Sequence, residues 1–200
     1  QAAFPSLKAL YLSGLRIHGQ ENPDSSPEIY ESLSSMPLLE DLSLDDVLPS
    51  DLSPSTRLKP PLFLPSLTYL SITETQAHPV APFLSIISVP STATIHVDLE
   101  FSDLRVSGDH VPELLHALSA AHQTPRSTSL KRSITRLDLE ASEYGDALSA
   151  IFWDDSYIPD KWERKLCLVL PSAVNASLIT CVNEEFDLSD IRWLSLSGFK

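Results

Sequence analysis

Residues 64–72 of the sequence read "LPSLTYLSI". Leu67, Leu70 and Ile72 are apolar, while most positions between them are polar. A short segment that alternates in this way is typical of a β-strand with one face in a core. The fold then depends on whether the strand stands alone or is one copy of a repeated unit.

The same pattern, apolar-x-x-apolar-x-apolar, recurs along the whole chain. The clear copies are "LKALYL" (7–12), "LEDLSL" (39–44), "LTYLSI" (67–72), "ITRLDL" (134–139) and "IRWLSL" (191–196), and the weaker ones are "TIHVDL" (94–99) and "KLCLVL" (165–170). Self-similarity at a spacing of about thirty residues indicates a repeat architecture. We therefore expect seven strands that occupy equivalent places in the fold.

The segments between the strands have helical features. Pro27 opens an amphipathic stretch, and the apolar residues of other stretches fall on one helical face. Helices are predicted at residues 27–35, 110–121, 144–153 and 175–182, and a short apolar helix or turn is predicted at 80–89. Alternating strands and helices at this spacing form βαβ units, whose fixed handedness makes the sheet parallel.

Polar residues within the strands indicate that one face of the sheet is in water. Glu40, Asp41 and Ser43 lie between the leucines of the second copy, at 39 and 44. In a sheet covered by helices on both faces, the strands would instead be continuous apolar runs. We therefore predict a solenoid in which stacked repeats share one core and all helices lie on one side. A doubly wound α/β enzyme, with its site at the carboxyl ends of the strands, is the less favoured alternative.

The pattern L-x-x-L-x-L at this spacing resembles the leucine-rich repeat family. The spelling "LPSLTYLSI…VAPFLSIISVP" is further similar to the repeat regions of fungal F-box-like proteins. The resemblance implies an α/β solenoid with a curved parallel sheet, helices on the convex side and about seven irregular repeats. It covers residues 1–200 as one domain, which we interpret as a fragment of a longer chain.

The chain departs from the family at the turn after each strand. Many leucine-rich repeats carry Asn or Cys there, where the side chain satisfies backbone groups. The corresponding positions hold Leu15, Val47, Thr75, Ser102, Ser142, Ala173 and Phe199. None is Asn or Cys, so irregular turns and unequal repeats are expected.

By this resemblance the chain is a protein–protein interaction module. It would be the substrate-recognition region of an F-box-like subunit of a cullin-type ubiquitin ligase, inside the cell. The cullin-ligase adaptor would bind a region outside this chain, and the chain itself would not be an enzyme. A scaffolding repeat domain without any link to a ligase is the alternative.

In such a solenoid, side chains between the strand leucines line the concave face. The predicted partner-binding residues are Tyr11, Asp41, Asp45, Tyr69, Asp98, Glu100, Asp138, Glu140 and Trp193. Carboxylates would steer a partner with a basic surface, and aromatic rings would anchor it. The alternative is a merely solvated face of an acidic protein. A register shift of one residue exchanges the two faces of a strand, so assignments in the two weaker copies are the most sensitive.

Composition argues against several other classes of function. The net charge is −13, and no basic face for nucleic acid is evident. No apolar run approaches the ~18 residues that span a bilayer, so no membrane partner is predicted. The chain has 5 Gly and no phosphate-binding or nucleophile motif, and its 2 Cys form neither a disulfide framework nor a metal set. No catalytic residue, cofactor or metal is therefore predicted.

Overall fold

A computed structural model describes residues 4–14, 26–48, 61–74, 79–90, 92–99, 110–121, 136–141, 147–153, 166–171, 182 and 193–197. Side chains are described at residues 4–14, 29–48, 61–74, 79–90, 92–99, 112–121 and 182.

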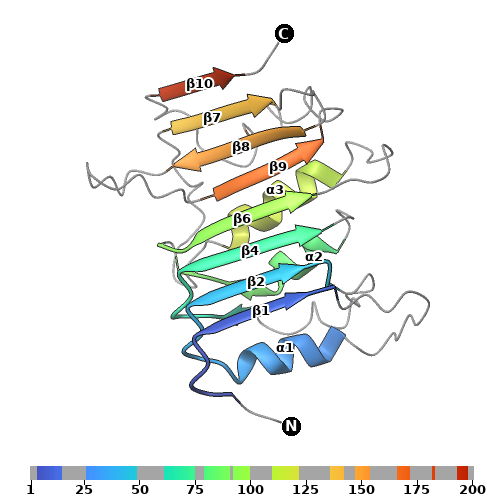
Figure 1. Cartoon of the computed structure of the whole chain (residues 1–200), viewed down its shortest axis with the longest axis vertical. Coiled ribbons are helices and arrows are strands. Elements are labelled where there is room, and N and C mark those ends of the chain that lie inside the picture. The colour runs from blue at the N-terminus through green and yellow to red at the C-terminus, as the bar shows by residue number, and fades with distance from the viewer. Residues whose placement is uncertain are drawn as a thin grey trace, which may run out of the picture.

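The main element is an eight-stranded sheet (Figure 1). Its strands, in spatial order, are β1 (Ala9–Ser13), β2 (Asp41–Asp45), β4 (Tyr69–Glu74), β6 (Thr94–Leu99), β9 (Leu166–Pro171), β8 (Ala147–Trp153), β7 (Arg136–Ala141) and β10 (Trp193–Ser197). β8 runs antiparallel to both of its neighbours, and every other neighbouring pair is parallel. β3 (Leu62–Phe63) and β5 (Ile87–Ser88) form a separate parallel pair.

The predicted α/β class and the mostly parallel sheet are confirmed. The curvature predicted for the sheet is wrong, because the sheet is open and not curved. The wholly parallel order is also wrong: residues 147–153, predicted as part of a helix, form the antiparallel strand β8. Ala and Leu in "ALSAIFW" favour a helix locally, but pairing with β7 on one side and β9 on the other overrides that preference.

Three helices are described: α1 (Ser26–Ser34), α2 (Val80–Ser85) and α3 (His110–Ala121). They agree with the helices predicted at 27–35 and 110–121 and with the short helix or turn predicted at 80–89, where the helix ends early and the chain continues into β5. The segment predicted as a helix at 175–182 lies outside the described residues, apart from Val182, which is helical and buried.

The core lies between the apolar face of the sheet and the helices. Leu42, Leu70 and Ile95 are fully buried at paired positions on β2, β4 and β6. Phe83 of α2 and Leu115 of α3 belong to the same core cluster, and Figure 1 shows both helices behind the sheet. Burying a side chain of this size stabilises the fold by about 1.5–3 kcal/mol, so these contacts fix which face of each strand is inside.

The same short turn leads into each of the first four parallel strands. The amide of Leu7 donates to Phe4 O (3.1 Å), and the next two turns have the same bond, from Leu39 to Met36 (3.2 Å) and from Leu67 to Leu64 (3.2 Å). In the fourth turn Ala93 donates to Pro90 O at 2.9 Å. The first three turns start their strands in a common register.

The fourth turn differs because it lies one residue closer to its strand. Tyr69 follows Leu67 by two positions, whereas Thr94, its partner on β6, directly follows Ala93. Ile95 and Val97 therefore take the places of Leu70 and Ile72. The predicted alignment of "TIHVDL" is thus shifted by two residues, and that of "KLCLVL" is shifted in the same way through the pairing of β9 with β6. A shift of two residues keeps every side chain on its predicted face.

Candidate functional site

The face of the sheet opposite the core is formed by three rows of paired residues across β1, β2, β4 and β6. The rows are Ala9–Asp41–Tyr69–Thr94, Tyr11–Ser43–Ser71–His96 and Ser13–Asp45–Thr73–Asp98. All of these residues are partly or fully exposed. The residues between them on β2, β4 and β6 are buried and apolar, and those between them on β1 are partly buried leucines. We call these three rows the polar face. They contain three carboxylates and no Lys or Arg, so this part of the surface is acidic.

The structure brings together five of the predicted binding residues on the polar face: Tyr11, Asp41, Asp45, Tyr69 and Asp98. Glu100 lies outside the described residues.

The other three predicted residues lie farther along the sheet. Asp138 and Glu140 are on β7 and Trp193 is on β10, and both β9 and β8 separate these strands from β6. Along the row of Asp98, the intervening positions are Val169 and Ser149, followed by Glu140. The carboxylates therefore fall into two groups separated by uncharged positions.

Tyr11 and Asp41 form a diagonal contact between β1 and β2. The Tyr11 hydroxyl donates to Asp41 Oδ2 at 2.8 Å, while 66% of Tyr11 is exposed. This hydrogen bond raises the pKa of Tyr11, with smaller contributions from burial and from the charges of Asp41 and Tyr69. Asp41 Oδ1 is inaccessible to solvent and has no hydrogen-bond partner among the described residues. A buried oxygen without a donor is costly, which marks Asp41 as a carboxylate with unused acceptor capacity.

Tyr69 makes a similar diagonal contact on the other side of the polar face. Its hydroxyl lies 3.5 Å from His96 Nδ1 on β6, and 36% of the residue is exposed. The contacts of the Tyr11 hydroxyl with Asp41 and of the Tyr69 hydroxyl with His96 orient two aromatic rings on the same exposed surface. Exposed rings held in place by a hydrogen bond at one end are suited to contact a partner with little loss of side-chain freedom.

The residues between the two tyrosines have small side chains. Ser43 and Ser71 are paired there in the middle row, and their side chains are the smallest on these two strands. Along β2, Ser43 lies between Asp41 and Asp45 on the same face, about 7 Å from each. We call the area bounded by Tyr11, Tyr69, Asp41 and Asp45, with these two serines as its floor, the serine basin.

Lys8 and Glu40 form an ion pair at the edge of the polar face where the strands begin. Lys8 Nζ lies 2.7 Å from Glu40 Oε1, with 67% and 47% of the two side chains exposed. Exposed pairs of this kind contribute little to stability. The pair nevertheless neutralises the nearest lysine, so the acidic character of the polar face is not offset from this side.

Glu74 has a structural role that the sequence did not reveal. It is fully buried at the end of β4, and its Oε1 accepts hydrogen bonds from the amides of Val47 (3.1 Å) and Leu48 (2.7 Å). Those amides follow Asp46, whose φ of 54° is in the left-handed region. Glu74 thus accepts the hydrogen bonds of two backbone amides in the turn after β2. Asp45 is the last residue of β2, directly before this turn. One feature of the sequence could have indicated this role: the alternation of β4 places the side chain of Glu74 on the inward face, where a carboxylate needs hydrogen-bond donors.

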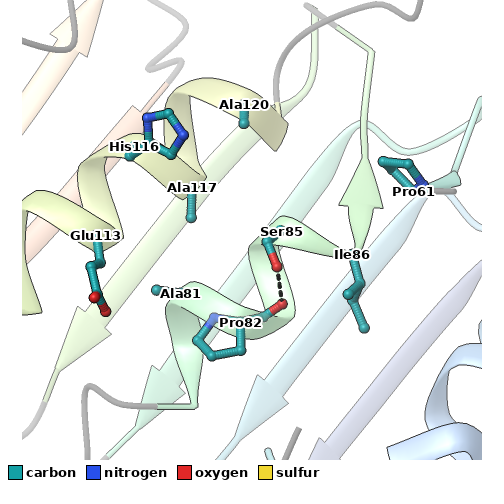
Figure 2. A pocket seen from close by; sticks show the side chains of 9 residues that line it. All are labelled: Pro61, Ala81, Pro82, Ser85, Ile86, Glu113, His116, Ala117 and Ala120. Atoms are coloured by element: carbon teal, nitrogen blue, oxygen red, sulfur yellow. Dashed lines mark hydrogen bonds between the residues drawn. The ribbon is translucent and has the colours of Figure 1, made fainter. Parts of the chain in front are cut away.

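A concave feature lies on the opposite side of the sheet, between α2 and α3. It is a groove of about 480 Å³. Figure 2 shows Glu113 and His116 of α3 beside it, with Ala81, Pro82 and Ser85 of α2 across from them. Within the described ranges, no group of three His, Cys, Asp or Glu residues could hold a metal ion. None of the three described helices is both long and apolar enough to cross a bilayer.

Comparison with known proteins gives no match to any family model, curated protein or solved structure.

Proposed function

We propose that this chain is an intracellular protein-recognition domain of the leucine-rich repeat type. In this proposal it is the substrate-recognition region of an F-box-like subunit of a cullin-type ubiquitin ligase. The chain holds a target protein through the polar face, and a region outside it binds the ligase adaptor. The mechanism is proximity, so the chain contributes binding and no chemical step.

Two features of the backbone support the repeat assignment. The four strands β1, β2, β4 and β6 are neighbours in chain order, and their inward apolar residues pair from Leu10 through Leu42 and Leu70 to Ile95. In the first three of these strands the paired residues are also equivalent in the repeated sequence pattern. The turns that precede them have the same hydrogen bond. A stacked set of equivalent units, each completing the core of its neighbour, accounts for both features.

The observation that carries the binding proposal is the pair of exposed tyrosines, Tyr11 and Tyr69, among carboxylates on the polar face. Tyrosine is enriched at the energetic centres of protein interfaces, since it adds a large contact area at low entropic cost. The three carboxylates of this face favour a partner with a basic surface, and they accelerate its association at low ionic strength.

Charge reversal on the polar face tests the binding proposal. Partner capture by the wild-type chain is compared with capture by Asp45→Lys/Asp98→Lys and by the control Glu31→Lys/Glu113→Lys, whose exposed glutamates lie on α1 and α3. Both double variants change the net charge equally. We expect the first to weaken capture at least about tenfold and the control to leave it unchanged, since only the first reverses charge at the interface. Equal losses in both variants, with both folded by circular dichroism, would overturn the role of the polar face.

The ligase assignment has a separate test. The full-length protein should co-precipitate a cullin-ligase adaptor, and deleting residues 1–200 should leave adaptor capture intact while stopping ubiquitylation of the captured target. A full-length protein that binds its target and no adaptor would instead support the scaffolding alternative.

A further inference from the structure

We propose that the serine basin is the anchor site for one arginine side chain of the partner. This inference rests on the proposed function, and it specifies the chemistry that the polar face recognises. The basin has a floor of Ser43 and Ser71, aromatic rings at Tyr11 and Tyr69, and carboxylates at Asp41 and Asp45.

The charges around the basin select a cation. Asp41 and Asp45 are on the same face of β2, and both are flanked by uncharged residues in their rows: Ala9 and Tyr69 beside Asp41, Ser13 and Thr73 beside Asp45. Lys8, the described lysine nearest in sequence to β1, is engaged by Glu40. A cation above Ser43 would therefore lie between two carboxylates with no lysine or arginine of the polar face to compete with it.

The unused oxygen of Asp41 selects a strong hydrogen-bond donor. Asp41 Oδ2 is occupied by Tyr11, and Oδ1 has no partner in the described part of the chain. Oδ1 is inaccessible in the unbound chain, so binding requires the carboxylate or the largely exposed Tyr11 ring to rotate. Terminal rotations of an aspartate are soft, and a charged donor recovers the cost of the unpaired oxygen.

The tyrosines favour arginine over lysine. A planar guanidinium stacks on an aromatic face and donates in a fixed fork, so it can contact a ring and a carboxylate together. The small side chains of Ser43 and Ser71 leave room for the flat group beside the rings, which larger side chains at these positions would fill. Lysine provides the positive charge but not the planar group that stacks on a ring, because its ammonium is a compact, strongly hydrated point charge.

The test uses three small probes on the whole chain: the N-acetyl, N-methylamide derivatives of arginine, lysine and citrulline. Citrulline has the shape of arginine without the charge. Backbone amide shifts of β1, β2 and β4 are followed by NMR during titration. We expect saturable shifts centred on Ser43 and Ser71 with the arginine probe, weaker binding of the lysine probe and no saturation with citrulline. Absence of saturation with arginine, or equal binding of any two probes, would overturn the proposal.

Variants locate the site. Asp41→Asn keeps an acceptor for the Tyr11 hydroxyl but removes the charge, and we expect it to raise the Kd of the arginine probe about tenfold or more. Glu113→Gln, which removes one exposed carboxylate of α3 on the other side of the sheet, is the matched control and should leave the Kd unchanged. Equal effects of the two substitutions would overturn the assignment to the basin. If Asp41→Asn leaves capture of the protein partner unchanged while Asp45→Lys/Asp98→Lys abolishes it, the arginine anchor fails and the recognition function stands.

Discussion

At the scale of single residues, the polar face depends on side chains that perform two tasks. Tyr11 offers an exposed ring while its hydroxyl is bound to Asp41, and Glu74 is buried while its carboxylate organises the turn beside Asp45. The exposed residues were predictable from alternation in the sequence. The contacts were not, because diagonal neighbours come from residues about thirty positions apart and depend on register.

The Tyr11 contact makes a prediction about pH. Its pKa is raised, chiefly by the hydrogen bond to Asp41, so the folded chain holds the phenol proton more tightly than the unfolded chain. This contribution to stability is present below the ordinary tyrosine pKa of about 10 and is lost as pH rises through the folded value. Carbon-13 NMR of labelled tyrosine, assigned with Tyr11→Phe, should show Tyr11 titrating above that value.

Asp41→Asn is the control for this titration. It removes both the charge of the acceptor and its coulombic effect, and we expect the Tyr11 midpoint to fall towards the ordinary value. Asp41→Ala also removes the acceptor of the hydrogen bond, and a Tyr11 midpoint that does not move in this second variant would show that Asp41 is not the cause.

Glu74 makes a prediction about stability. Glu74→Leu removes the acceptor for the Val47 and Leu48 amides, so we expect a loss of about 1–3 kcal/mol in the free energy of unfolding. Glu74→Gln keeps a carbonyl acceptor and should lose less. Urea unfolding measures both, with Thr73→Leu on the opposite face of β4 as the control. Equal stability of Glu74→Leu and wild type would contradict the role assigned to Glu74.

At the scale of elements, each strand separates core from surface by alternation. Leu70 is fully buried between Leu42 and Ile95, while the next residue, Ser71, lies on the polar face. Periodicity predicts this division well, because a period of two is dictated by the backbone of a strand. It predicted the helices α1 and α3 and seven strands, which are β1, β2, β4, β6, β7, β9 and β10. It missed β8, where sequence preference and pairing disagree.

We expect Leu70→Ala to destabilise the chain by about 2–5 kcal/mol, because it leaves a cavity between paired core residues. Ser71→Ala should change the free energy of unfolding by less than about 0.5 kcal/mol. Chemical denaturation of the two variants compares adjacent positions on one strand. Similar losses at both positions would mean that the faces of β4 are assigned incorrectly.

At the scale of the whole molecule, strand order determines which surfaces meet. Seven equivalent copies in sequence imply neighbours in chain order, but β9 and β8 are inserted between β6 and β7. The order of the strands in the sheet could not be predicted from the sequence. The alternation of apolar and polar residues in β8 and β9 is compatible with pairing to several different strands. The result is that Asp138 and Glu140 are not adjacent to Asp98, which limits the candidate site to the first four parallel strands.

Cross-linking tests this order. His96 pairs in register with Cys167, at a distance between Cα atoms that parallel neighbours set at about 5 Å. In a Cys181→Ser background, His96→Cys should form a disulfide with Cys167 on oxidation. The control carries His96→Cys, Asp138→Cys and Cys167→Ser, and should not cross-link, since three strand spacings separate β6 from β7. Cross-linking in the control alone would restore the order implied by the repeats.

The order of the sheet also has a consequence for handling the protein. β1 and β10 are its two outermost strands, and each has one neighbour among the described strands. Their outer backbone amides and carbonyls form a template on which another extended chain can add. Phe4, five residues before β1, is 53% exposed, and Leu10 and Leu12 of β1 are partly exposed. Aggregation in concentrated solution should therefore begin at β1, and a proline introduced there should delay it.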